Sequence, residues 1–306
     1  MLQITRIRLA MKQIRNILAT ALLLVSSIAV AQQESVYTFY RQHMNLVNPA
    51  YAGMDSVTIA TSTLRKQWTG IANAPETQAV SFGTSMGKKV GLGMTVISDK
   101  TFIEKQTYFS LDFSYRLKMS ETAEVYFGIK AGGNTYNVNT SGLETYNVQA
   151  DPALASISTF NPNVGVGAVY KEGAMYISLS IPRLFNAKRA KNDAGYASVA
   201  TDSPHIYLSG GYDIPLQGEF STLVLKPSAM LRYVSGAPVS LDLTTMLQID
   251  KTFELGAMYR TDKAYAAMAT VVISKRLLFG YAYEMSTRPA LASARNTNEI
   301  LLQFKF

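Results

Sequence analysis

The sequence predicts an all-β fold, a transmembrane outer-membrane β-barrel of about 14 antiparallel strands with an N-terminal segment in or against the barrel. Three observations support this prediction. Hydrophobic residues make up 48% of the 306 residues, yet the mean hydropathy is only +0.06, so apolar and polar residues must be interleaved. Segments of about 10 residues alternate between apolar and polar positions, as membrane-spanning strands do. The connections between these segments are alternately short and long.

Residues 1–31 have the pattern of a cleaved signal peptide. Lys12 and Arg15 precede a short apolar stretch, and Ala29-Val30-Ala31 forms a small-x-small cleavage site. An uncleaved transmembrane anchor is the alternative, but the stretch is shorter than the roughly 20 residues that a spanning helix needs. We therefore expect export to the outer membrane, with cleavage near Ala31/Gln32.

The composition narrows the possible function classes. Four of the 29 basic residues lie in the signal and none of the 21 acidic ones does, so cleavage lowers the net charge from +8 to about +4. This charge gives no electrostatic basis for a nucleic-acid partner. The lack of cysteine excludes disulfides and cysteine metal sites, and two histidines form no histidine cluster. We expect no cofactor, no metal and no enzymatic activity.

Residues 32–54 precede the first predicted strand and are rich in aromatic residues, namely Tyr37, Phe39, Tyr40 and Tyr51. A free tail is not expected to carry so much aromatic surface, because burial of aromatic rings is strongly favourable. We predict that this segment is a plug inside the barrel or packs against its periplasmic rim.

The barrel itself is predicted over residues 55–306. Its strands are expected at residues 55–66, 76–86, 89–99, 105–117, 122–136, 161–171, 173–181, 203–214, 220–234, 238–250, 252–261, 264–273, 275–285 and 297–306. The number of strands is even, as in bacterial single-chain barrels.

The clearest alternation runs from Tyr108 to Leu117. Phe109, Leu111 and Phe113 share a face that we expect in lipid, while Asp112 and Arg116 share the lumen face. A soluble β-sandwich also alternates in this way. The length of the segments favours the membrane, because soluble strands usually have only about 5–6 residues.

The connections sort by length, with tight inner turns and long outer loops, as an outer-membrane barrel requires. The tight turns are expected at residues 87–88, 118–121, 172–173, 215–219, 250–251 and 274–275. The long loops are Gln67–Pro75, Asn137–Phe160, Pro182–Asp202 and Ser286–Asn296. Their content of Asn, Ser, Thr, Ala, Gly and Pro predicts no strands within them.

Charged residues of both signs fall on the predicted lumen face. They are Arg65, Arg116, Lys130, Lys226, Arg232, Arg260, Lys305, Asp112, Asp242, Glu254 and Glu284. Mixed signs predict structural ion pairs rather than the one-sign ring of a selective pore. His205 is the only histidine on a predicted strand, but no Gly-x-Ser-x-Gly motif accompanies it, so a phospholipase-like site is the weaker interpretation.

Glycines recur in short repeats such as Gly91-x-Gly93 and Gly165-x-Gly167. None of these repeats opens a helix within a βαβ unit, so they do not indicate a nucleotide-binding loop. Bends and close packing in a barrel explain them better.

Several tracts of the predicted mature chain are more specific than its periodicity. The most distinctive are Asn48–Gly53 (NPAYAG), Arg65–Ile71 (RKQWTGI) and Ala74–Thr77 (APET), followed by Ser178–Phe185, Leu208–Tyr212, Leu255–Thr261 and Gly280–Glu284. Together they resemble the PorP/SprF outer-membrane proteins of the Bacteroidetes type IX secretion and gliding motility system. The family pattern favours Gly-Ala-Pro where this chain has Asn73, a residue type that tolerates positive φ.

The resemblance implies an accessory barrel that binds client proteins, such as large adhesins, through their C-terminal domain and helps to secrete or surface-anchor them. It also implies contacts with other periplasmic or lipoprotein components of the system. The candidate partner-binding residues are Asn48, Pro49, Tyr51, Gly53, Arg65, Gln67, Trp68 and Pro75. A transport barrel for small hydrophobic or polar solutes is the alternative function, and an interfacial belt residue is the alternative for Trp68.

Overall fold

The computed structural model describes residues 36–55, 57–140, 157–188, 201–216, 222–287 and 296–306. The predicted signal peptide and its cleavage site lie outside these residues. The described strands are β1 (Ile59–Gln67), β2 (Glu76–Met86), β3 (Val90–Thr101), β4 (Glu104–Lys118), β5 (Ala123–Val138), β6 (Ile157–Glu172), β7 (Met175–Ile181), β8 (Ala187–Lys188), β9 (Thr201–Asp202), β10 (His205–Tyr212), β11 (Ile214–Leu216), β12 (Leu223–Val234), β13 (Ser240–Ile249), β14 (Phe253–Arg260), β15 (Ala264–Val272), β16 (Leu277–Ser286) and β17 (Asn296–Lys305).

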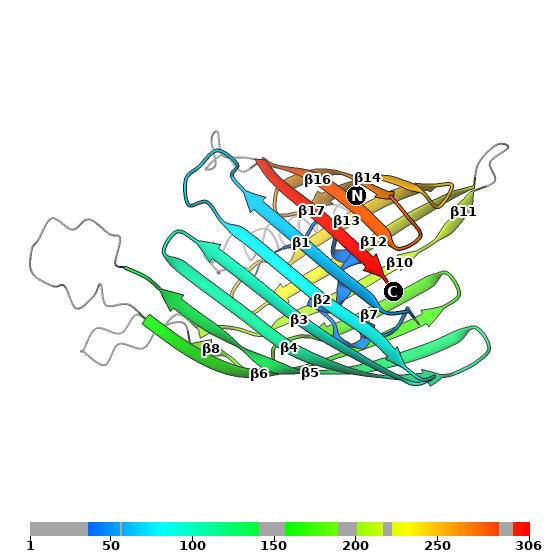
Figure 1. Cartoon of the computed structure of the whole chain (residues 1–306), viewed down its shortest axis with the longest axis horizontal. Helices are drawn as coiled ribbons and strands as arrows, with labels where there is room; N and C mark the ends of the chain where they lie inside the picture. The colour runs from blue at the N-terminus through cyan, green and yellow to red at the C-terminus, as the bar shows by residue number, and fades with distance from the viewer. Residues whose placement is uncertain (1–35, 56, 141–156, 189–200, 217–221, 288–295) are drawn as a thin grey trace, which may run out of the picture.

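The strands form a closed antiparallel barrel (Figure 1). The first strand pairs with the last, with Ile59 opposite Lys305 and Gln67 opposite Thr297. The ring is complete because β10 pairs with β12. β10 and β11 occupy successive parts of one edge of β12, so the barrel has 14 strands around its circumference. The predicted fold class and strand number are confirmed.

The strand boundaries correct the prediction in several places. The strand predicted at 203–214 is divided into β10 and β11 at Asp213, and β11 continues to Leu216, into the turn predicted at 215–219. β1 begins at Ile59 rather than at residue 55. β6 begins at Ile157, four residues earlier than predicted, because it continues the ladder with β5 up to Val138. The prediction of a strand-free loop at 182–202 was wrong, since β8 and β9 pair there as a two-residue ladder. Residues 141–156, 189–200 and 288–295 of the predicted loops lie outside the described residues.

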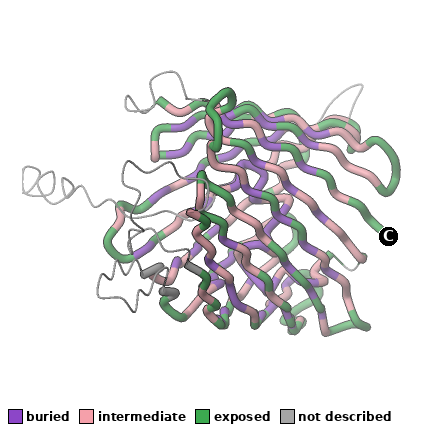
Figure 2. Tube along the Cα trace, turned by 60° about the vertical axis from the view of Figure 1, so that its left-hand side comes forward, coloured by how far each residue is buried: buried purple, intermediate pink, exposed green. Residues whose placement is uncertain are grey.

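The two faces of the barrel wall follow the predicted alternation, which Figure 2 shows as alternating colours along the strands. On β4, Phe109, Leu111 and Phe113 are 48%, 64% and 40% exposed and point outward. Asp112 and Ser114 are each 2% exposed and point into the lumen. The register predicted for this strand is confirmed, and its apolar face is the one that contacts lipid in a membrane barrel.

Short and long connections lie at opposite ends of the barrel. The hairpins β2–β3, β4–β5, β6–β7, β13–β14 and β15–β16 turn through two to four residues at the end that also holds the C-terminus. We call this the inner end and expect it to face the periplasm. The long connections that leave β1, β5, β7 and β16 all lie at the opposite end, which we call the outer end.

Residues 36–54, which we call the plug, lie inside the barrel and are drawn in blue in Figure 1. They form three short 3₁₀ helices, η1 (Tyr40–Gln42), η2 (Met44–Leu46) and η3 (Pro49–Tyr51). No helix in the described part of the chain is long and apolar enough to cross a membrane. The predicted N-terminal segment within the barrel is confirmed.

Candidate functional site

Glu299 of β17 holds the first residues of the plug. Its carboxylate accepts hydrogen bonds from the backbone N–H groups of Thr38 (2.8 Å) and Phe39 (3.0 Å) and from Nη1 of Arg65 (3.0 Å). Glu299 is 1% exposed and Arg65 is 2% exposed. A buried carboxylate is stable only when it is paired and hydrogen-bonded. The plug therefore completes the environment that this carboxylate needs, and the carboxylate in turn fixes the plug.

This contact is part of a longer chain of ion pairs across the lumen wall. The chain runs in the order Glu299, Arg65, Glu284, Arg260, Asp242 and Arg232. Glu284 links its two halves, since Oε1 accepts from Arg65 at 2.8 Å and Oε2 accepts from Arg260 at 3.0 Å. Three arginines alternate with three carboxylates, so this side of the lumen is electrically balanced.

The predicted mixed-sign ion pairs are thus confirmed. Further pairs join Lys130 to Asp112, Lys226 to Glu254 and Arg116 to Glu124. Lys305 is the exception, since it is exposed and forms no ion pair with a described residue. The sequence prediction missed Glu299. Pairing of the first strand with the last, which closes the barrel, places Glu299 directly opposite Arg65 and could have revealed it.

Apolar contacts of Phe39 and hydrogen bonds of His43 also hold the plug. Phe39 has no exposed surface and packs in a cluster with Met246, Met258, Ala266, Met268, Ala282 and Leu301 of the lumen wall. Methionine adapts to irregular gaps, which suits a wall that must receive a phenyl ring. The imidazole of His43 bridges two strands through Thr63 Oγ1 (2.9 Å) and Ser81 Oγ (2.7 Å).

The Asn48–Gly53 turn fastens the other end of the plug. The Asn48 side chain accepts from the backbone N–H of Ala50 at 2.9 Å, which caps η3. Its Nδ2 donates to Ser178 Oγ at 3.1 Å and to the carbonyl oxygen of Ala168 at 3.3 Å. Asn48 has no exposed surface. One buried amide therefore shapes the turn and bonds it to β6 and β7.

The wall is hollowed to receive this turn at two of the glycine repeats. A Cβ at Gly91 would overlap the carbonyl oxygen of Ala52, and a Cβ at Gly167 would overlap the side-chain amide oxygen of Asn48. Close approach of two backbones requires glycine at such positions. The interpretation of these glycines as close-packing positions is confirmed.

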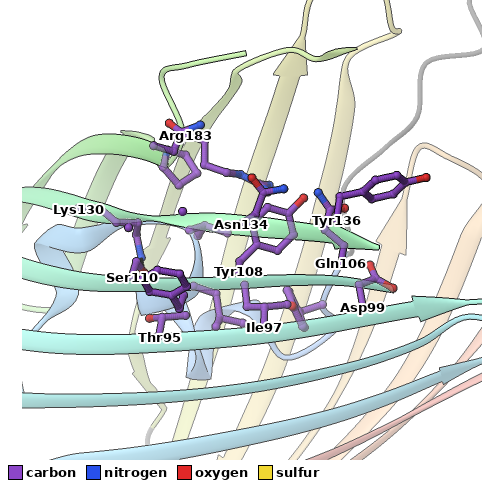
Figure 3. A pocket seen from close by; sticks show the side chains of 18 of the residues that line it. Thr95, Ile97, Asp99, Gln106, Tyr108, Ser110, Lys130, Asn134, Tyr136 and Arg183 are labelled. Atoms are coloured by element: carbon purple, nitrogen blue, oxygen red, sulfur yellow. Dashed lines mark hydrogen bonds between the residues drawn. The ribbon is translucent and has the colours of Figure 1, made fainter. Parts of the chain in front are cut away.

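The outer half of the lumen contains a cavity of about 500 Å³, which we call the outer cavity. Tyr37, Leu46 and Val47 of the plug line it from below, and β3 to β6 supply most of its wall. Figure 3 shows Tyr108 and Asn134 side by side on the adjacent strands β4 and β5, where they are register partners.

Aromatic and amide groups dominate the chemistry of the outer cavity. The guanidinium of Arg183 lies 4.1 Å from the centroid of the Tyr108 ring. Asn134 is 2% exposed, and its Nδ2 donates no hydrogen bond to a described residue. Aromatic and arginine side chains are the usual energetic anchors of protein interfaces, and an unsatisfied amide donor fits a backbone carbonyl or carboxylate. The arrangement suits an inserted polypeptide segment.

The eight candidate partner-binding residues separate into two groups in the structure. Five lie within the lumen as parts of the plug and its anchor, namely Asn48, Pro49, Tyr51, Gly53 and Arg65. Gln67, Trp68 and Pro75 lie at the outer end, where the backbone N–H of Gln67 donates to the carbonyl of Pro75 at 2.9 Å.

Trp68 lines the outer cavity. Its backbone is left-handed, with φ +51°, and its N–H donates to the carbonyl of Asn296 at 2.7 Å. Asn73 in the same loop has φ +57°. This left-handed conformation is expected at a position where the family pattern has glycine. The single tryptophan is therefore half-buried at the edge of the outer cavity.

The sequence prediction did not single out Asn134, Tyr136 and Arg183 as site residues, although all three line the outer cavity. They belong to no chemical motif, and only the alternation along β5 places the first two on the lumen face. His205, the weaker catalytic candidate, contacts the carbonyl oxygen of Ser203 through Nδ1 (3.1 Å) and stacks on Tyr207. Among the described residues, no group of three or more His, Cys, Asp or Glu could hold a metal ion.

Residues 29–304 match the model of a protein family described as type IX secretion system membrane protein PorP/SprF. No curated protein matches the chain at a significant level. Similar solved structures include the outer membrane protein Omp33 of Acinetobacter baumannii, at 8% identity and a TM-score of 0.48 over 82% of this chain and 98% of that one. OmpF of Salmonella typhi in complex with daunomycin matches at 9% identity and a TM-score of 0.38, over 83% and 99%. The KdgM porin matches at 8% identity and 0.39, over 81% and 99%.

Proposed function

The chain belongs to the PorP/SprF family of type IX secretion system membrane proteins, and from this premise we propose that its outer cavity binds the C-terminal domain of a secreted client. The barrel would help to secrete such a client, for example a large adhesin, or to anchor it at the cell surface. Residues 1–31 would be removed as a signal peptide near Ala31/Gln32 before the barrel enters the outer membrane.

The proposal is supported by the position of the plug beneath the outer cavity. Plug residues line it from below, and the plug is bonded to the wall at both ends, through Glu299 and through Asn48. A cavity that opens at one end retains a segment that enters it, whereas an open lumen lets it pass. The geometry thus favours holding a polypeptide over conducting a solute.

Within this proposal the two groups of candidate residues have different roles. Gln67, Trp68 and Pro75 contact the client directly, because they lie at the outer end and Trp68 lines the cavity. The five lumen residues, from Asn48 to Arg65, act indirectly by holding the plug that forms the floor. Loops on a rigid scaffold commonly carry recognition in this way.

The alternative function, transport of small hydrophobic or polar solutes, needs a path past the plug. Such a path would require the plug to leave contacts that are largely buried, including those of Phe39 and Asn48. Conductance or solute-uptake measurements distinguish the two functions, since only transport needs a steady open pore. Other type IX secretion components, periplasmic or lipoprotein, are further proposed partners.

Trp68→Ala tests the client site. We expect the variant barrel to fold and to migrate heat-modifiably on gels, while surface display of the client falls, because aromatic anchors dominate interface energy. Purification of the tagged barrel from its own outer membrane should recover less client with the variant.

Tyr265→Ala is the matched control, since this tyrosine is 54% exposed on the outward face near the outer end of β15. It should leave client display intact. A folded Trp68→Ala barrel with unchanged client display and recovery would contradict the proposed site.

A further inference from the structure

The inner end of the lumen contains a second cavity, of about 420 Å³, which we call the inner cavity. Its lining combines Arg41 and Gln42 of the plug with the inner parts of β12 to β17. The plug residues that line the outer cavity, Tyr37, Leu46 and Val47, are different ones. The two cavities therefore lie against different parts of the plug, and ligands of the inner cavity enter from the inner end.

Charge distinguishes the inner cavity from the rest of the lumen. Four cations line it, Arg41, Lys226, Lys251 and Lys305, against the single carboxylate of Glu254. This imbalance contrasts with the alternating ion pairs of the neighbouring wall.

Two of these cations are already neutralised. Glu254 pairs with Lys226 and also accepts from Gln248 Nε2 at 2.9 Å. Arg41 pairs with Asp213, in the short break between β10 and β11. Lys251 and Lys305 are exposed and form no ion pair with a described residue, so their charge is available to a ligand.

Two polar side-chain atoms beside the inner cavity also lack partners. Oε1 of Gln42 and Nη1 of Arg41 are buried and form no hydrogen bond with a described residue. Gln303 holds the plug nearby, with Nε2 donating to the carbonyl of Gln42 at 3.3 Å. A buried polar atom without a partner costs free energy, which a ligand with matching groups recovers.

We propose that the inner cavity binds an acidic polypeptide segment of a periplasmic partner. Carboxylates of that segment pair with Lys251 and Lys305, and its backbone amide groups bond to the free atoms of Gln42 and Arg41. Clustered cations at the mouth of such a cavity also attract an acidic segment over distance and speed its association.

Polypeptide fits these features better than the other anions of the periplasmic side. A phospholipid headgroup is kept away by the barrel wall, because its acyl chains must stay in the bilayer outside. A cavity of about 420 Å³ is far larger than an inorganic anion needs. Glutamine side chains, which offer both a donor and an acceptor, match the peptide backbone.

The test is binding of a fluorescent Glu-rich peptide to the purified full-length barrel in detergent. Lys251→Gln combined with Lys305→Gln should weaken binding by about tenfold at low salt, as expected for the loss of two exposed ion pairs. Lys251→Arg with Lys305→Arg should retain it. The matched control removes the same charge at the same end, with Lys88→Gln and Lys89→Gln on the β2–β3 turn outside the cavity, and should leave binding unchanged.

Four results would overturn the proposal. The first is that a peptide with Gln in place of Glu binds as tightly as the Glu-rich peptide, and the second is that the Lys88→Gln and Lys89→Gln control weakens binding as much as the cavity variant. The third is that inorganic phosphate at matched charge displaces the peptide. The fourth is that the peptide binds only when the barrel is in nanodiscs of anionic phospholipid. Surface display of the client tests the outer cavity, whereas peptide binding tests the inner cavity. Failure of one proposal can therefore be distinguished from failure of the other.

Discussion

The two ends of the plug are held to the barrel wall by different physical means. The first end, at Thr38 and Phe39, is bonded to a buried carboxylate within a chain of ion pairs. The second end, at Asn48–Gly53, is fitted by shape into glycine-lined hollows of β3 and β6. The ion pair at the first end depends on closure of β1 against β17. The hollows at the second end depend on β3 to β6, which pair one after another in chain order. The first end therefore docks only in a closed barrel.

Removal of the carboxylate at the first end should have the largest effect. Glu299→Ala leaves Arg65 buried without this partner and removes two bonds from the plug backbone. Breaking a buried ion pair from one side typically costs about 3–5 kcal/mol. Because the chain has no cysteine, the labelling rate of a single Thr38→Cys reports release of this end, and we expect it to rise.

The control for this prediction is Glu124→Ala, which removes the half-exposed partner of Arg116. An exposed pair contributes only about 0–1 kcal/mol, so labelling of Thr38→Cys should stay slow. Equal labelling in the Glu299→Ala and Glu124→Ala backgrounds would show that the ion-pair chain does not fasten the plug.

Filling a hollow at the second end should have an intermediate effect. Gly167→Val places a side chain where the Asn48 amide lies, and overpacking of this kind costs about 1–3 kcal/mol. We expect faster labelling of Ala50→Cys with little change at Thr38→Cys. Ala257→Val, on the outward face of β14, adds bulk without reaching the plug and should change neither rate.

Loss of the Asn48 amide should have an effect close to that of the filled hollow. Asn48→Ala removes the cap on the Ala50 N–H, which costs about 0.5–2 kcal/mol, and also the bonds that Nδ2 donates to Ser178 and Ala168. Asn48→Asp keeps this acceptor but sets a buried carboxylate oxygen against the carbonyl oxygens of Ala168 and Leu179, so it should not recover the loss. If client display falls in Asn48→Ala while labelling of Ala50→Cys stays slow, Asn48 contacts a partner directly and does not merely support the plug.

Local sequence was sufficient for most of the barrel, because membrane strands alternate residue by residue. The outward face of Phe109, Leu111 and Phe113 needs no knowledge of neighbouring strands. The start of β6 does need it: Ile157, Thr159 and Phe160 favour a strand, but the point at which the strand begins is set by pairing with β5 up to Val138. The short ladder of β8 with β9 was hidden for the same reason.

The site was predictable only in part. The aromatic content of residues 32–54 predicts a packed segment, and the mixed charges predict ion pairs. Arg65 and Glu299 are 234 residues apart in the chain and meet only through barrel closure, so no local pattern joins them. The inward direction of Trp68 depends on a left-handed backbone that residues other than glycine rarely adopt. The first of these features holds the plug, and the second places Trp68 beside the outer cavity.

Conductance of the purified barrel in a planar bilayer shows whether the plug closes the lumen and leaves an outer cavity that can hold a polypeptide. We expect a closed wild-type barrel and frequent openings in Glu299→Ala, where the first end of the plug is released. A steady open conductance in the wild type, unchanged by Glu299→Ala, would contradict it.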